Sequence, residues 1–200
     1  MKFLSLLIIF LGIFTISNAQ LTKSTWLVGG SGSFNSSNEN FNSPSYSQTA
    51  KTTSINVNGS FGFFLADKFV VGIQPYLSTT KGVVTYSSSG SGGSTNSFQL
   101  AAGPFARYYF LNAEKNYNLL TDISYQIGIN KSNGAQVAKG KFNTFSLMSG
   151  AEFFFNQTAG IEILLGYRTQ IASIEDAPGA YTNNKEGFQV SIGFQFHLIK

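Results

Sequence analysis

Residues 187–200 read GFQVSIGFQFHLIK, and this C-terminal stretch decides the fold. Large apolar residues occupy every second position, and small or polar residues lie between them. Successive side chains of a β-strand point to opposite faces, so the alternation predicts a strand with one apolar and one polar face. The apolar positions are Phe188, Val190, Ile192, Phe194, Phe196 and Leu198, and the others are Gln189, Ser191, Gly193, Gln195 and His197.

The N-terminus has the three-part plan of a secretory signal peptide. Lys2 precedes an apolar run from Phe3 to Ile16, and small and polar residues follow up to Ala19. The run is shorter than the ~20 residues that a spanning helix needs. We therefore predict a signal peptide over residues 1–19, cleaved after Ala19, and one domain over residues 20–200.

The composition limits what kind of protein can follow the signal peptide. Charged residues make up only 11% of the chain, against about 25% in an ordinary soluble domain. The chain has no cysteine, so a well-paired sheet rather than disulfides has to hold an exported domain together. The formal charge of +4 comes from scattered lysines and forms no basic stripe, so we expect no nucleic-acid partner.

Eight segments of the mature chain alternate in the same way, and most are long enough for the ~9–11 tilted residues that cross a bilayer. No later apolar stretch has the length of a spanning helix, and lipid accepts strands only in a closed barrel. The sequence therefore predicts an all-β fold, an eight-stranded antiparallel up-and-down transmembrane β-barrel. The segments are Thr25–Phe34, Thr53–Leu65, Phe69–Ser78, Ser97–Phe110, Asn116–Ile129, Lys141–Phe155, Ala159–Ile171 and Phe188–Ile199.

The connections between these segments alternate in length. Short turns are expected at Ala66–Lys68, Leu111–Lys115 and Asn156–Thr158. Such a rhythm is typical of outer-membrane barrels, which have tight periplasmic turns and longer outer loops. Four long loops rich in Ser, Asn and Gly are expected at Asn35–Thr52, Thr79–Asn96, Asn130–Gly140 and Ala172–Gly187.

The polar face of the strands is small and almost uncharged, which suits the filled interior of a narrow barrel, so we expect a packed polar lumen. The few ions on that face predict a lumen charge network of two arginines and three carboxylates, because charges away from water need partners. The competing interpretation is a selectivity gate in a small pore. The network residues are Arg107, Asp122, Glu152, Glu162 and Arg168.

Aromatic residues gather near the short turns and the C-terminus. Aromatic rings favour the interface between hydrocarbon and headgroups, so this clustering predicts an aromatic girdle rather than core residues. The expected girdle comprises Trp26, Phe63, Phe69, Tyr108, Phe110, Tyr117, Phe153, Phe155, Phe194 and Phe196. Phe64, Tyr109 and Phe154 belong to the same sequence cluster.

No catalytic, cofactor or metal site is expected. His197 is the sole histidine and lies in the last strand, at the end of the short turns, where a structural role is expected. A histidine-activated nucleophile near the outer rim is therefore excluded, and His/Cys metal clusters are excluded by composition.

Three stretches carry a family resemblance: TWLVGGSGSF (25–34), GFFLADKFVVGI (62–73) and GPFARYYF (103–110). They resemble the outer-membrane β-barrel domain family of Gram-negative bacteria, often labelled porin-family. The resemblance covers the mature chain and implies an eight-stranded barrel in outer-membrane lipid. It also implies insertion by the outer-membrane assembly machinery, which reads an aromatic C-terminal strand; Phe194 and Phe196 fit that signal, although the chain ends in HLIK.

The leading functional hypothesis is a non-enzymatic outer-membrane protein in envelope integrity or surface interaction, without an identified surface-loop partner. One alternative is a narrow pore for ions or very small solutes, and another is a secreted soluble barrel that binds an apolar ligand. In the leading hypothesis the apolar face of residues 188–198 contacts lipid, and the strand closes the barrel against Thr25–Phe34. A charge at Ile192 should then block insertion, while one at Ser191 should be better tolerated.

Overall fold

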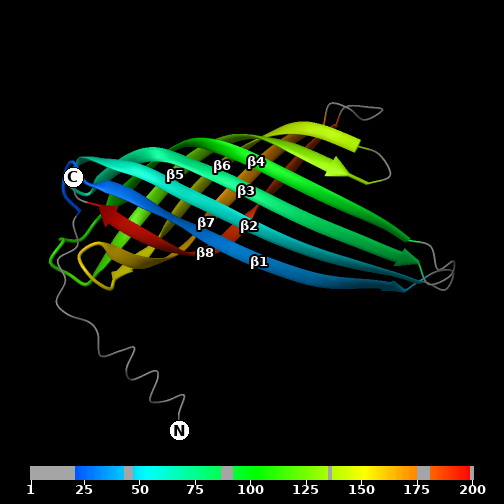
Figure 1. The fold of residues 1–200 in the computed structure, drawn as a ribbon, viewed down its shortest axis with the longest axis horizontal. Helices are drawn as coiled ribbons and strands as arrows, with labels where there is room; N and C mark the ends of the chain where they lie inside the picture. Colours follow the sequence, from blue (N-terminus) through cyan, green and yellow to red (C-terminus); the bar gives the residue numbers. More distant parts are fainter. Residues whose placement is uncertain (1–20, 43–46, 87–91, 135–136, 175–180, 199–200) are drawn as a thin grey trace, which may run out of the picture.

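Eight antiparallel strands form a closed barrel in the part of the chain that the computed structural model describes, residues 21–42, 47–86, 92–134, 137–174 and 181–198 (Figure 1). Neighbours in sequence are neighbours in the sheet, and the last strand pairs with the first. The predicted eight-stranded up-and-down barrel is thus confirmed, whereas the predicted signal peptide lies outside the described residues. The strands are β1 (Trp26–Asn42), β2 (Ser47–Ala66), β3 (Phe69–Tyr86), β4 (Gly92–Tyr109), β5 (Tyr117–Asn133), β6 (Val137–Phe154), β7 (Ala159–Ile174) and β8 (Tyr181–Leu198).

The alternation in β8 resolves into an outer and an inner face. Phe188 is 83% exposed and Phe194 is 56% exposed, whereas Gln195 and His197 are completely buried. The apolar face therefore points away from the barrel, and the polar face points into it. The same holds on β7, where Ile163 is exposed and Glu162 is buried.

Tight turns join the strands at the end of the barrel where β1 begins and β8 ends. Asp67 and Lys68 connect β2 to β3, and Lys68 adopts a positive φ of 66°. Before β7, Asn156 Oδ1 accepts hydrogen bonds of 2.8 Å from the backbone N–H groups of Thr158 and Ala159. Asn side chains commonly stabilise turns in this way.

The strands extend much further than the apolar alternation predicts. The β1–β2 ladder continues to the pair Asn42–Ser47, and the β3–β4 ladder continues to Thr85–Gly92. The expected long loops are therefore wrong over most of their length, because these residues are paired hairpin strands. The hydrophobic pattern does not predict these strand extensions, because Ser, Asn and Thr lie on both of their faces. The apolar alternation therefore ends there, although the backbone pairing continues.

One junction of the barrel wall is much shorter than the others. β1 pairs with β8 only from Trp26–Leu198 to Ser31–Gly193, whereas β2 pairs with β3 along nearly its whole length. In the described structure, β1 does not pair with β8 from Gly32 onward, and the residues of β8 up to Ile192 do not pair with β1. In Figure 1 the two strands run together near the end marked C and then diverge. We call this opening the β1–β8 seam.

The lumen is filled at the end of the tight turns. Gly62 and Gly72 pair with each other across β2 and β3, and the ring of Phe105 lies over both. A Cβ at Gly62 would lie 2.9 Å from Phe105 Cζ, so these positions need glycine for space. Leu21, which precedes β1, is buried in the same cluster as Phe105, and its carbonyl accepts a hydrogen bond from Lys68 N–H (2.9 Å).

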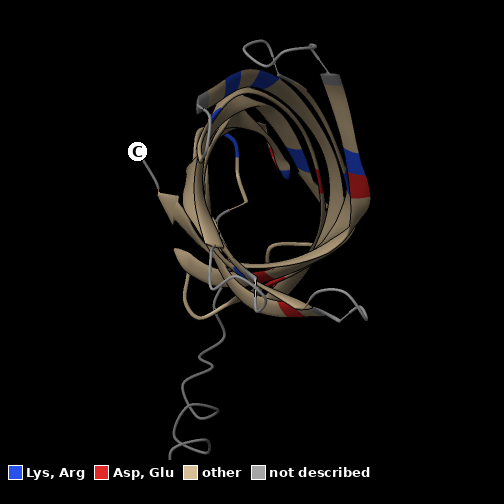
Figure 2. Cartoon of the chain, turned by 90° about the vertical axis from the view of Figure 1, so that its right-hand side faces the viewer, with Lys and Arg blue, Asp and Glu red and all other residues tan. Residues whose placement is uncertain are grey.

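Viewed from the opposite end, the barrel wall carries charged residues at only scattered positions (Figure 2). Among the described residues, the structure contains no helix that is both long and apolar enough to cross a bilayer.

Candidate functional site in the lumen

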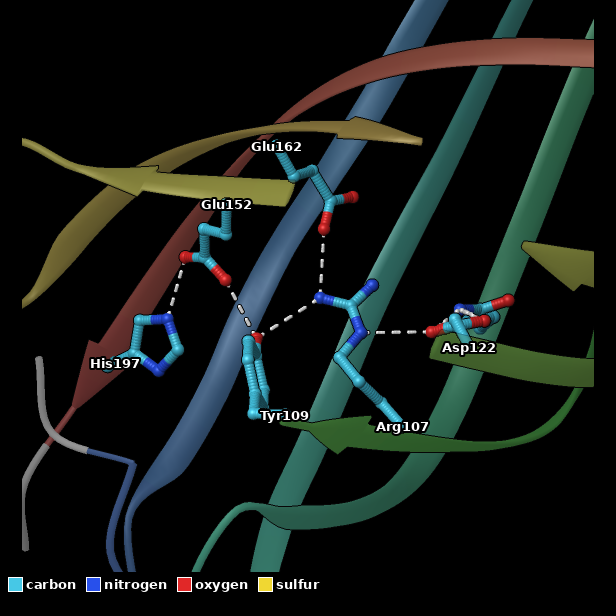
Figure 3. Close-up of polar contacts among 7 residues, drawn as sticks. Arg107, Tyr109, Asp122, Glu152, Glu162 and His197 are labelled. Carbon is cyan, nitrogen blue, oxygen red and sulfur yellow. Dashed lines mark hydrogen bonds and ion pairs between the residues drawn. The ribbon is translucent and has the colours of Figure 1, made fainter. Parts of the chain in front are cut away.

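Arg107 lies at the centre of a buried polar network near the floor of the lumen (Figure 3). Its Nε atom lies 3.0 Å from Asp122 Oδ2, and its Nη1 atom lies 2.9 Å from Glu162 Oε2. The register places Arg107 directly opposite Asp122 on β4 and β5. Glu162 reaches the same guanidinium from β7, on the other side of the lumen. The buried guanidinium thus has a carboxylate partner on each side, and a buried charge requires such partners.

The second half of the network is centred on Glu152. Tyr109 Oη donates a hydrogen bond of 2.8 Å to Glu152 Oε2, and His197 Nε2 lies 2.8 Å from Glu152 Oε1. Arg107 Nη1 donates a longer hydrogen bond of 3.4 Å to Tyr109 Oη, which joins the two halves. Glu152 and Glu162 occupy opposite positions on β6 and β7, yet they face different partners.

Sequence reasoning missed three members of this network or their partners. Tyr109 was grouped with the aromatic cluster, although it shares the strand face of Arg107 two residues earlier. Gln74 Nε2 donates to both carboxylate oxygens of Asp122, at 3.2 and 3.3 Å. The alternation predicts that His197 faces the lumen, but its contact with Glu152 joins β8 to β6, past the intervening β7. Alternation identifies the face of a side chain and cannot identify its partners on strands that are not adjacent in the sheet.

Arg168 does not join the ion pairs, so its expected place in the network is wrong. Its guanidinium carbon lies 4.8 Å from the ring centroid of Tyr76, in a cation–π contact. Its Nη2 atom is buried and has no hydrogen-bond partner among the described residues. Register explains the difference, because Arg168 lies six residues beyond Glu162 on β7 and therefore well above the floor.

The lumen is packed at the floor and hollow above it. The floor is formed by buried side chains around His197, including Phe64, Tyr109 and Phe154, whose ring centroids lie 5.5–6.0 Å from that of His197. Above them lies a cavity of about 290 Å³. The expectation of a packed lumen is therefore correct for the floor and wrong for the upper lumen. The cavity is lined mainly by serine, asparagine and glutamine, together with Arg107, Asp122, Glu162 and Arg168.

The expected girdle residues lie on the outer face near the tight turns. Trp26 packs edge-on against Phe63 with ring centroids 5.1 Å apart, and Tyr108 packs in the same way on Phe110 at 5.2 Å. Trp26, Tyr108, Phe110, Tyr117, Phe153, Phe194 and Phe196 are exposed, and Phe63, Phe69 and Phe155 are partly exposed. The remaining three aromatics of the sequence cluster, Phe64, Tyr109 and Phe154, point inward and form the floor.

Comparison with solved structures places this architecture among bacterial outer-membrane barrels. The outer membrane protein OprG from Pseudomonas aeruginosa is similar, with a TM-score of 0.52 and 12% identity over 92% of this chain and 100% of that chain. The transport unit of the autotransporter AIDA-I from Escherichia coli has a TM-score of 0.44 and 13% identity over 93% of this chain and 78% of that one. No protein-family model matches the chain. No curated protein matches it either. The likeness to OprG supports the fold that the family resemblance implied.

Proposed function

We propose that the chain is an integral outer-membrane protein that is neither an enzyme nor an open pore, and that it acts in envelope integrity or surface interaction. In this proposal the signal peptide is removed after Ala19, the assembly machinery inserts the barrel, and the tight turns face the periplasm. The observation that carries the proposal is the combination of an apolar outer face with a lumen that is closed at its floor.

The outer face has the dimensions of a lipid-contacting band. On β8 six outward apolar residues run from Leu198 to Phe188, and all are exposed. At about 3.4 Å per residue and a tilt near 40°, this segment spans roughly 25 Å along the barrel axis, which is the height of the apolar band in outer-membrane barrels. Beyond Phe188 the outward positions become polar, beginning with Glu186.

A soluble ligand-binding barrel is disfavoured because the two faces have the wrong polarity. Such a barrel needs an apolar cavity and a charged exterior. Here the cavity is lined mainly by polar residues, and Ile73, Ile127 and Leu165 are each more than half exposed on the outside. Exposed apolar surface of this extent is typical of a membrane interface.

The floor argues against a conducting pore. Phe64, Tyr109 and Phe154 are buried beneath the cavity, and Glu152 and His197 fill the space between them. A path for hydrated ions would have to break the buried contacts that Glu152 makes with Tyr109 and His197. Breaking buried hydrogen bonds costs free energy. The hairpins on the opposite side extend beyond the apolar band and present polar surface for interactions outside the cell.

An enzymatic role is disfavoured by the position of the histidine. His197 lies at the floor, where its Nε2 atom contacts Glu152 and its ring is completely buried. Hydrolytic chemistry would require an activated nucleophile accessible to substrate. The sequence contains no second histidine that could take this role at the outer rim.

Cell fractionation and electrophoresis test the membrane assignment. The protein should fractionate with the outer membrane and migrate differently on detergent gels before and after boiling, because a folded barrel resists unfolding by detergent at room temperature. Full recovery in the soluble periplasmic fraction would refute the assignment.

Liposome swelling tests the closed floor. Proteoliposomes with the purified barrel should swell no faster in small sugars or amino acids than liposomes without protein. Swelling that decreases with solute size would instead establish the narrow pore.

A further inference from the structure

The β1–β8 seam opens at the level of the apolar band. Ile192 pairs with Ile163 on β7, and Phe34 pairs with Ile55 on β2, and all four side chains face outward. Edge strands expose unpaired backbone N–H and C=O groups, and hydrocarbon offers these groups no hydrogen-bond partners. At this depth the seam therefore has to lie against something other than lipid tails alone.

The lumen cavity reaches the seam. Its lining includes Ser31, Gly32 and Ser33 of β1. It also includes Val190 and Ile192 of β8, which face outward and are 68% and 54% exposed. A cavity bordered by lumen-facing and lipid-facing residues of both strands passes through the wall of the barrel. The hollow part of the lumen thus opens sideways, toward the membrane.

Arg168 is the charged residue of this cavity that has no ion-pair partner among the described residues. The other charged groups that line it are already engaged, because Arg107 contacts both Asp122 and Glu162. Below them Glu152 contacts Tyr109 and His197. Arg168 packs on Tyr76, and its buried Nη2 atom lacks a partner among the described side chains and backbone groups. A guanidinium that is held against an aromatic ring and still has a free N–H donor can bind a carboxylate or phosphate.

We propose that the cavity binds the anionic head group of a single-chain amphiphile, and that its acyl chain leaves through the β1–β8 seam into the membrane. The head group, a carboxylate or a phosphate, contacts Arg168. The serine, asparagine and glutamine side chains of the wall satisfy its remaining polar atoms. Phe34, Val190 and Ile192 flank the chain where it leaves. The inference rests on the membrane insertion proposed above.

The size of the cavity fits a head group rather than a whole lipid. Its volume of about 290 Å³ lies at the lower end of ligand pockets, which measure roughly 300–1,000 Å³. A chain of many methylenes has no room inside and would lie against polar walls there. An exit through the seam avoids both problems.

The proposal is tested with probes that carry the anionic head group, the acyl tail or both. Their binding to the purified full barrel in detergent micelles is measured by native mass spectrometry. Palmitate and lysophosphatidate carry both parts, hexadecanol carries the tail alone, and acetate and inorganic phosphate carry the head alone. At least one of the two complete amphiphiles should bind more tightly than hexadecanol and the tail-free anions. A preference for palmitate or for lysophosphatidate identifies the head group.

Arg168→Gln should weaken binding of the preferred amphiphile about ten- to a hundred-fold, because a charge-assisted contact is lost. Arg168→Lys should recover part of the affinity. Each variant is first checked for the gel mobility of a folded barrel, so failure to fold and failure to bind are separate results. Unchanged binding in Arg168→Gln would overturn the proposal, as would equal binding of hexadecanol.

A second variant tests the seam itself. A Cβ at Gly32 would meet only Asn56 O at 3.7 Å, so the barrel has room for Gly32→Phe, which adds a ring on the outward side of the seam, where the acyl chain would leave. Gly82→Phe is a control for added bulk away from the seam, because a Cβ there meets only Thr95 O at 3.9 Å and β3 is paired on both sides. Its side chain points to the lumen, so it places no ring at the seam. Gly32→Phe should abolish amphiphile binding while Gly82→Phe preserves it. If both bind normally, or if phosphate alone binds as well as lysophosphatidate, the ligand enters from the outer mouth and the seam has no role.

Discussion

His197 Nε2 lies 2.8 Å from Glu152 Oε1, so the strand that ends the chain is tied past β7 to β6. Both side chains are completely buried. The contact joins the closing strand to the polar network, and through Tyr109 to Arg107. The closure of the barrel and the sealing of its floor therefore depend on the same residues.

Replacement of His197 should destabilise the barrel. His197→Leu removes a contact from a buried carboxylate, and we expect the free energy of unfolding to fall by about 1–3 kcal/mol. His197→Gln, which retains a donor, should lose less. Urea unfolding followed by Trp26 fluorescence measures the difference, and equal stability of His197→Leu and the parent protein would contradict a role for the contact.

Arg107 should be the most sensitive position of the network. Arg107→Met leaves Asp122 and Glu162 without a cation in the lumen, and loss of one partner of a buried ion pair costs about 3–5 kcal/mol. The combined change of Arg107→Met, Asp122→Leu and Glu162→Leu removes the uncompensated charges. It should therefore be more stable than Arg107→Met alone in the same urea experiment, and the reverse order would exclude charge compensation as the cause.

Sequence periodicity predicted the direction of the side chains well and their partners poorly. The period of two identified the outer face of β8 and the inner positions of Arg107 and Glu162, because alternation follows directly from strand geometry. It failed for Arg168, whose partner depends on height in the lumen, and for Tyr109, whose residue type suggested the girdle. Periodicity also failed to predict the strands beyond the apolar band, because a paired strand with two polar faces has no hydrophobic period.

Arg168→Ala should leave ion conductance unchanged. Arg168 lines the cavity above the floor, so its removal widens a space that is already closed below. A double change of Phe64→Ala and Tyr109→Ala removes two floor side chains and should admit ions. Single-channel recordings in planar bilayers compare the two variants. A large increase in conductance from Arg168→Ala alone would identify Arg168 as a gate.

The outer hairpins should behave as structured strands in solution. Backbone amides around Lys51 and Gly82 belong to the β2–β3 ladder, although they lie beyond the apolar band. Their hydrogen exchange should be slower than that of the Asp67–Lys68 turn between the same two strands. Mass spectrometry of peptides from the exchanged barrel measures both rates, and fast exchange around Lys51 would show that the ladder is absent there in solution.

The register of β8 makes opposite predictions for adjacent residues. Ile192 lies midway along the outward apolar positions and is 54% exposed, whereas Ser191 shares the inward face of the buried Gln195 and His197. A lysine on the lipid face near the midplane costs about 2–4 kcal/mol, so Ile192→Lys should reduce insertion into liposomes. Ser191→Lys points instead toward the cavity that holds Asp122 and Glu162, and it should insert nearly as well as the parent protein. The folded fraction on unboiled detergent gels reports insertion for both variants. Equal loss in the two would show that the lumen tolerates charge no better than lipid, and the opposite order would reverse the assigned faces.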